Sequence, residues 1–296
     1  MNLVVGSTGI LGSEICRALA TAGKPVRALV RPTAEGYKVD ALRSIGAEIV
    51  NGDVQDRASL DTACRGATAV FTTLSTTYSR QPGDSIQASD LEGQQALVDA
   101  AKGADVQNFV YVSMTENAPE DMPFVKVRRS VEEYVRHSGI PYTILRPSSF
   151  METYLNPLVG FDVASGRVSV FGSGEGKINW ISAGDIAEFA VQSLDNPTAR
   201  NATLELGGPD HVSPMDVVRM AEEMRGGTIE VFHVTEDMLQ AQIAGANDDY
   251  GVVFPQFALG MIIPGERKTD MRALLRAFPS IELTGVEDYV RQFIPE

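Results

Sequence analysis

Three glycines near the start of the chain could hold the phosphates of a dinucleotide. Gly6, Gly9 and Gly12 lie in the string LVVGSTGILGSEI, after a short apolar segment and at the start of an amphipathic one. Glycine permits a tight turn, lets backbone approach a pyrophosphate and allows a helix to pack closely. The amides of a helix N-terminus would then face the phosphates. A glycine turn without a ligand is the alternative. The other residues expected at the phosphates are Thr8, Ile10 and Leu11.

The end of the next apolar segment, RALVRPT, indicates which dinucleotide is bound. NAD-binding units have an acidic residue there that accepts a hydrogen bond from the ribose 2′-hydroxyl. This chain has Arg31 instead, nineteen residues after Gly12. A guanidinium suits a 2′-phosphate through two parallel hydrogen bonds, and Thr8 could add a hydroxyl. We therefore expect NADP(H), with a solvated surface arginine as the alternative interpretation.

Two further strings follow apolar segments. In NGDV, Asp53 could accept a hydrogen bond from the adenine amino group while Val54 packs against the ring. The string TTLS ends the fourth apolar segment, at the crevice where ligands of open parallel sheets bind. Ordinary loop chemistry explains either string equally well. The residues of TTLS expected at the cofactor are Thr73, Leu74 and Ser75.

These residues need a scaffold, and the first half of the chain predicts one. Short apolar segments alternate with amphipathic ones, which is typical of a Rossmann-type doubly wound α/β fold with a parallel sheet. The expected strands are Leu3–Val5, Val26–Val30, Glu48–Val50, Ala69–Thr72, Phe109–Val112 and Tyr142–Leu145. The expected helices are Ser13–Ala22, Arg57–Cys64, Ser89–Lys102 and Val125–His137.

The pattern changes after Pro147. We expect residues 1–150 to bind NADP(H), and residues 151–296 to form a small α/β lobe that binds the substrate and completes the sheet. Ser213 and Thr235 are predicted helix caps. The string DDYGVVFPQFALGMIIPG is predicted to be an apolar loop that contributes to a lid. The strands expected in this half are Arg167–Phe171, Thr203–Leu206 and Thr228–Val234.

Composition excludes several classes of function. A net charge of −14 over 296 residues disfavours nucleic acids and anionic membranes as partners. The two cysteines, Cys16 and Cys64, and three scattered histidines lack metal-ligand spacing, so we expect no metal site. The sequence contains no Ser/His/Asp pattern, so hydrolysis is disfavoured. With neither a signal-like start nor an apolar run of ~20 residues, a cytoplasmic protein is expected.

Several strings together resemble the NmrA-like group of atypical short-chain dehydrogenases/reductases. They are GSTGILG, ALVRP, NGDVQD, FVYVS, VEEYVRHSGIPYTILRPSSFMETYL and WISAGDIAEFAV, and the resemblance spans roughly residues 1–210. The group includes NADPH-dependent quinone and triphenylmethane dye reductases, isoflavone-type reductases and non-catalytic NADP(H)-sensing regulators. The resemblance implies that Ser113 contacts the cofactor and that Pro147 and Phe150 lie at the nicotinamide.

The chain departs from the wider superfamily at its proton donor. The resemblance implies a Tyr-x-x-x-Lys pair before SGIPYTILRP, but Phe124 and Arg128 stand at those positions. Met114 also replaces the serine or threonine that usually follows Ser113. Lys126 is no substitute, because on a helix it would point ~160° away from Arg128. Arg128 could clamp a ribose or phosphate of the cofactor, and it can orient and polarise a ligand, but it is no acid at neutral pH; a buried ion pair or a helix-end contact is its alternative role.

The remaining candidates lie around the expected nicotinamide. Tyr78 and Tyr154 are the nearest candidate acids, with ordinary pocket or surface tyrosines as the alternative. Aromatic and methionine side chains could form an adaptable apolar pocket for a flat ligand, or simply the core of the lobe. The residues expected at the substrate are Met114, Phe150, Met151, Tyr154 and Trp180.

Three hypotheses follow for the function. The first is an NADPH-dependent reductase that transfers hydride directly to a quinone-like or other aromatic acceptor, which needs no Tyr/Lys pair. The second is a non-catalytic NADP(H) sensor that binds a protein partner. The third is an isomerase or dehydratase that uses NADP(H) without net turnover. A homodimer is also possible under any of the three.

Overall fold

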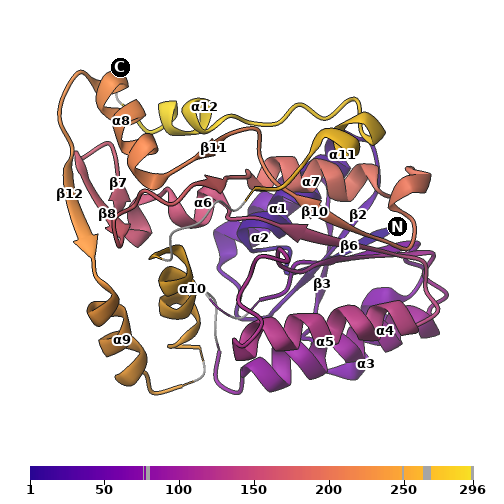
Figure 1. The fold of residues 1–296 in the computed structure, drawn as a ribbon. Helices are drawn as coiled ribbons and strands as arrows, with labels where there is room; N and C mark the ends of the chain where they lie inside the picture. Colours follow the sequence, from indigo (N-terminus) through magenta and orange to yellow (C-terminus); the bar gives the residue numbers. More distant parts are fainter. Residues whose placement is uncertain (76, 78–80, 249, 263–267, 295–296) are drawn as a thin grey trace.

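The computed structural model describes residues 1–75, 77, 81–248, 250–262 and 268–294. Its centre is a parallel sheet of seven strands in the order β10-β6-β5-β4-β1-β2-β3 (Figure 1). Six of these strands have the order of a Rossmann fold, and β10 extends the sheet beside β6. The strands are β1 (Asn2–Val5), β2 (Val26–Val30), β3 (Glu48–Asn51), β4 (Ala69–Thr72), β5 (Asn108–Val112), β6 (Tyr142–Pro147) and β10 (Ala202–Leu206).

Helices cover both faces of this sheet. Every residue of β1 and β4 is buried, as expected for strands covered on both sides. One apolar core includes the buried side chains of α1, α2 and α7, and a second includes those of α3, α4 and α5. The helices of the first face are α1 (Ile10–Thr21), α2 (Gly36–Ser44), α7 (Ala183–Gln192) and α11 (Arg272–Ala277). Those of the second are α3 (Arg57–Cys64), α4 (Gln94–Gly103) and α5 (Pro123–His137).

A smaller lobe lies beside the carboxyl ends of the strands (Figure 1). It has its own core, in which Trp180, Val217 and Val286 are fully buried. Its strands are β7 (Phe161–Asp162), β8 (Arg167–Phe171), β9 (Ile178–Asn179), β11 (His211–Val212) and β12 (Glu230–Val234). Its helices are α6 (Met151–Tyr154), α8 (Pro214–Arg225), α9 (Glu236–Ala244), α10 (Val253–Ile262) and α12 (Val286–Arg291). Single 3-10 turns lie at Pro157–Val159 and Pro197–Ala199.

The doubly wound sheet and the helix caps are confirmed. Ser213 caps α8 in a capping box with Asp216, and Thr235 caps α9 by accepting the Met238 N–H. Two predictions were wrong in detail. The expected helix Ser89–Lys102 is a π-helix, η1 (Ile86–Gly93), followed by α4. The apolar string expected as a loop contains the helix α10. The short helix α2 was not predicted.

No described helix is long and apolar enough to cross a membrane. Within the same ranges no group of histidine, cysteine and acidic side chains is arranged to hold a metal ion. Both cysteines are buried, and burial raises the pKa of the Cys16 thiol to about 12, so this thiol stays protonated at neutral pH.

Candidate functional site

A cavity of about 1330 Å³ lies where the sheet meets the lobe. The loops that follow the first six strands of the sheet line one side, and Phe257, Gly260 and Met261 of α10 line the other. Sites for drug-sized ligands usually measure about 300–1,000 Å³. The cavity can therefore hold a dinucleotide together with a second small molecule.

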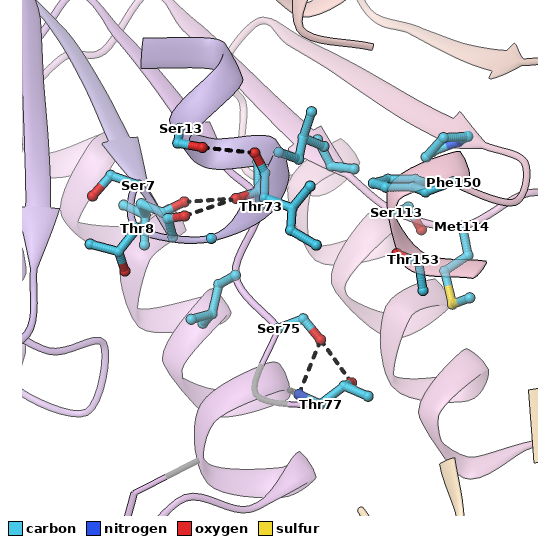
Figure 2. Close-up of a pocket in the computed structure, with 18 of the residues that line it drawn as sticks. Ser7, Thr8, Ser13, Thr73, Ser75, Thr77, Ser113, Met114, Phe150 and Thr153 are labelled. Carbon is cyan, nitrogen blue, oxygen red and sulfur yellow. Dashed lines mark hydrogen bonds between the residues drawn. The ribbon is translucent and has the colours of Figure 1, made fainter. Parts of the chain in front are cut away.

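The glycine turn forms one wall of this cavity. Gly6 has a positive φ of +80°, and a side chain on Gly6 would meet the Thr73 hydroxyl at 2.7 Å. The Gly9 N–H donates to the Gly6 carbonyl at 3.0 Å. Gly9 precedes α1 and provides no side-chain cap, so the first amides of α1 have no partner from that residue. In Figure 2, Ser7 and Thr8 lie on this turn beside Thr73.

Gly12 affects the cavity through the packing of α1 against the glycine turn. A Cβ atom on Gly12 would lie 2.0 Å from the Gly6 carbonyl oxygen, so only glycine lets α1 approach the turn this closely. Gly12 itself does not line the cavity. The buried Ser7 hydroxyl donates to the Leu29 carbonyl at 2.8 Å and fixes the turn against β2. These contacts make a rigid, backbone-lined cradle.

Arg31 lies in the cavity wall but is not a solvated surface residue. Its side chain is 17% exposed and is held by two carboxylates. The Nε atom lies 2.8 Å from Asp53, and the two terminal nitrogens donate to Asp84 at 2.8 and 2.9 Å. The prediction of an arginine open to a 2′-phosphate was therefore incomplete, because Asp84 follows 53 residues later and its approach is not visible in the sequence.

Arg128 forms the centre of a buried group between β5 and η1. One terminal nitrogen donates to the Leu74 carbonyl at 2.9 Å and lies 3.5 Å from an Asp90 oxygen. The other Asp90 oxygen accepts the Tyr250 hydroxyl at 2.7 Å. The guanidinium also lies 4.9 Å from the centre of the Phe124 ring, within range of a cation–π contact.

The predicted helix face is confirmed by these contacts. Phe124 and Arg128 are buried and line the cavity, whereas Lys126 is exposed. The ion pair with Asp90 matches the alternative role stated for Arg128. Its Nε atom is nevertheless buried without a hydrogen-bond partner among the described residues. A buried donor without a partner is rare, but this atom has almost no accessible surface, so it is the rest of the Arg128 side chain that lines the cavity.

A second buried carboxylate, Glu132, organises the loops after β5 and β6. Its oxygens lie 2.6 Å from Arg129 and 2.5 Å from Arg146, and Arg136 lies at 3.1 Å. Burial opposes the charge, but the hydrogen bonds from Arg146 and Ser113 lower the pKa of Glu132. Ser113 donates to Glu132 at 2.5 Å. Its hydroxyl proton is therefore committed to this network.

The apolar part of the cavity lies beyond Ser113. Figure 2 shows Ser113, Met114, Phe150 and Thr153 on the side opposite the glycine turn. Tyr154 also lines the cavity and stacks on Phe254, with 6.2 Å between the ring centres.

Two residues expected at the substrate are elsewhere. Met151 and Trp180 are fully buried in the core of the lobe and are not among the lining residues. The Trp180 indole donates to the Val212 carbonyl at 3.0 Å, so its polar edge is already satisfied inside the lobe. Tyr78, the other candidate acid, lies outside the described residues.

The structure brings most of the predicted cofactor residues to one cavity. Those that line it are Gly6, Thr8, Gly9, Ile10, Leu11, Arg31, Asp53, Val54, Thr73, Leu74, Ser75, Ser113, Arg128, Pro147 and Phe150. The lining residues that were not predicted come from many segments, including α2 and α10. Among them are Tyr37, Lys38, Leu42, Phe257, Gly260 and Met261. The apolar string around Phe257 was the available signal for α10.

The chain matches one family model and is similar to several known proteins. The model of the NmrA-like family matches residues 2–263. The NAD(P)H azoreductase of Xenophilus azovorans is 29% identical over 88% of this chain and 90% of its own length. The photosystem II assembly factor Ycf39 of Guillardia theta is 31% identical over 80% of this chain and 74% of its own. Among solved structures, an NADPH-dependent quinone oxidoreductase from Escherichia coli complexed with NADPH has a TM-score of 0.78 at 22% identity, covering 99% of both chains.

Proposed function

The chain belongs to the NmrA-like family, and we propose that it is an NADPH-dependent reductase that transfers a hydride to a flat, quinone-like or other aromatic acceptor. The single observation that carries the proposal is the cavity, which joins a glycine cradle for phosphates to an apolar compartment. The names of an azoreductase and a quinone oxidoreductase among its relatives support the same reaction class.

The residues present fit a dinucleotide. The cradle at Gly6 and Gly12 has no room for side chains, and the first amides of α1 can meet a pyrophosphate. Thr73 and Ser75 continue the polar wall toward Phe150. We propose that residues 1–150 hold the nucleotide and that the lobe holds the acceptor. When bound, the reduced nicotinamide supplies the hydride.

The residues around the acceptor would mainly position it. Phe150, Met114 and Phe257 offer apolar contact to a planar ring. Hydride addition to a quinone leaves a negative charge on oxygen, and water supplies the proton that completes the hydroquinone. Arg128 is a permanent cation in the cavity wall, 3.5 Å from Asp90. It would stabilise the developing anion without transferring a proton.

The test is the oxidation of NADPH by the purified chain with simple quinones, an azo dye and a triphenylmethane dye as acceptors. We expect turnover with at least one quinone, with an equal amount of hydroquinone formed. Inactivity with all three classes, while NADPH still binds in a direct titration, would refute the reductase and leave only a nucleotide-binding protein.

A second candidate is a nucleotide-dependent protein binder. It is favoured by the similarity to an assembly factor and by Phe124, which replaces a hydroxyl at the expected acid position. A captured partner whose affinity differs between NADPH and NADP⁺ would support this function. Equal recovery of every partner with both nucleotides would remove its support.

A further inference from the structure

Arg31 is already engaged by carboxylates at the end of the cavity where we expect the adenosine to bind. All three of its side-chain nitrogens contact carboxylates: Nε lies 2.8 Å from Asp53, and the terminal pair holds both oxygens of Asp84. This two-point contact with Asp84 uses the same fork of N–H groups that would bind a phosphate. Arg31 therefore cannot offer this fork to a 2′-phosphate without giving up Asp84.

Asp84 is fixed by more than this ion pair. Its side chain is only 3% exposed, and its oxygens also accept the Gln81 backbone N–H at 2.9 Å, the Ser89 hydroxyl at 2.7 Å and the Gln55 amide at 3.1 Å. Burial opposes the charge of Asp84, but the bonds from Arg31, Ser89 and Gln81 lower its pKa. The carboxylate is thus charged and held in place beside Arg31, although Asp84 itself does not line the cavity.

The charge balance disfavours a further anion. One guanidinium faces two carboxylates, so the group formed by Arg31, Asp53 and Asp84 has a net charge of −1. Lys38 is a second cation that lines the cavity nearby, but it pairs with Glu35 at 2.5 Å. Both of these side chains are exposed, where ion pairs contribute little and exchange readily. NADH has an uncharged ribose hydroxyl in place of the 2′-phosphate, so its binding here requires no additional cation.

We propose that Asp84 determines nucleotide specificity by competing with the 2′-phosphate for Arg31. The competition lowers the preference for NADPH over NADH below what an arginine at this position would otherwise produce. The proposal rests on the proposed function, since it needs a nicotinamide nucleotide in the cavity. The loop before η1, which carries Asp84, would then take part in nucleotide specificity together with the glycine turn and β2.

The experiment compares dissociation constants for NADPH and NADH by calorimetry, in the whole chain and in three variants. Asp84→Asn keeps the size of the side chain but releases the charged fork of Arg31. The matched control, Asp53→Asn, also removes one negative charge beside Arg31 but leaves Asp84 on the fork. The double variant Arg31→Gln with Asp84→Asn tests whether the effect passes through the arginine.

We expect Asp84→Asn to increase the NADPH preference about tenfold, since a charge-assisted pair is replaced by a phosphate contact. The preference should change less than threefold in Asp53→Asn, and the gain should disappear in the double variant. An unchanged preference in Asp84→Asn, or an equal gain in both single variants, would overturn the proposal. If neither nucleotide binds the unmodified chain, the proposed function fails as well, and the two failures are thereby distinguished.

Discussion

Replacing Glu132 by Gln should destabilise the chain strongly. This residue has no exposed side-chain surface and serves as the counter-ion of Arg129, Arg136 and Arg146. Glutamine has nearly the same shape but no charge, so three guanidinium groups would lose their common partner. The loops after β5 and β6, which line the cavity, would lose the anchor that joins them.

The size of the effect follows from burial. Breaking a buried ion pair by removing one partner costs about 3–5 kcal/mol. The arginine side chains here are 17–26% exposed, and water screens them in part. We therefore expect a loss of about 2–4 kcal/mol in the free energy of unfolding, measured by urea denaturation at neutral pH. The matched control is Glu133→Gln, because Glu133 pairs with Arg136 but is 59% exposed. That variant should stay within about 0.5 kcal/mol of the original chain.

The pH dependence of the same pair of variants gives an independent check. The pKa of Glu132 is lowered in the folded chain, so its contribution to stability is complete above the pKa of an ordinary glutamate, about 4.3. That contribution is lost as pH falls through the lower folded pKa. The difference between Glu132→Gln and the original chain should therefore shrink below about pH 4. A variant as stable as Glu133→Gln at neutral pH would refute the role given to Glu132.

Three other substitutions test the cavity. Gly12→Ala places a Cβ 2.0 Å from a carbonyl oxygen of the turn, so nucleotide affinity measured by titration should fall about 100-fold or more. Arg128→Gln should lower the quinone turnover rate about 100-fold, whereas Lys126→Gln, on the exposed face of the same helix, should change it less than twofold. Tyr250→Phe removes a buried hydrogen bond to Asp90 and should lower the free energy of unfolding by about 1–3 kcal/mol in urea denaturation. An unchanged free energy of unfolding would contradict the buried Tyr250–Asp90 pair.

The features predicted correctly from the sequence are those set by neighbouring residues. The alternation of apolar segments gave the sheet, because strands covered on both faces are almost wholly apolar. The glycine turn was found from its position between a strand and a helix. Ser213 was recognised as a cap because Pro and Asp follow it at the positions that a first turn favours.

The features that were missed depend on residues far apart in the chain. Asp84 meets Arg31, and Tyr250 meets Asp90, although 53 and 160 residues separate the partners. Trp180 was expected at the substrate or in the core of the lobe, and its side chain satisfies both its apolar ring and its N–H within the lobe. No pattern of period two or 3.6 contains this information, since it arises only when segments far apart in the chain pack together.

Phe124 and Arg128, which stand where the resemblance implies a Tyr/Lys pair, bear on what the proposed reductase would reduce. Phe124 removes a hydroxyl from the helix, while Arg128 retains a positive charge that cannot be lost at neutral pH. Ser113 cannot compensate, because its proton is committed to Glu132 at 2.5 Å. On this helix and strand, therefore, a developing anion is stabilised but not protonated. Quinones tolerate this, since a hydroquinone anion leaves the reaction and takes its proton from water. A simple ketone would form a strongly basic alkoxide and needs its proton during hydride transfer, so under the proposed function the cavity would select acceptors by the basicity of their reduced form.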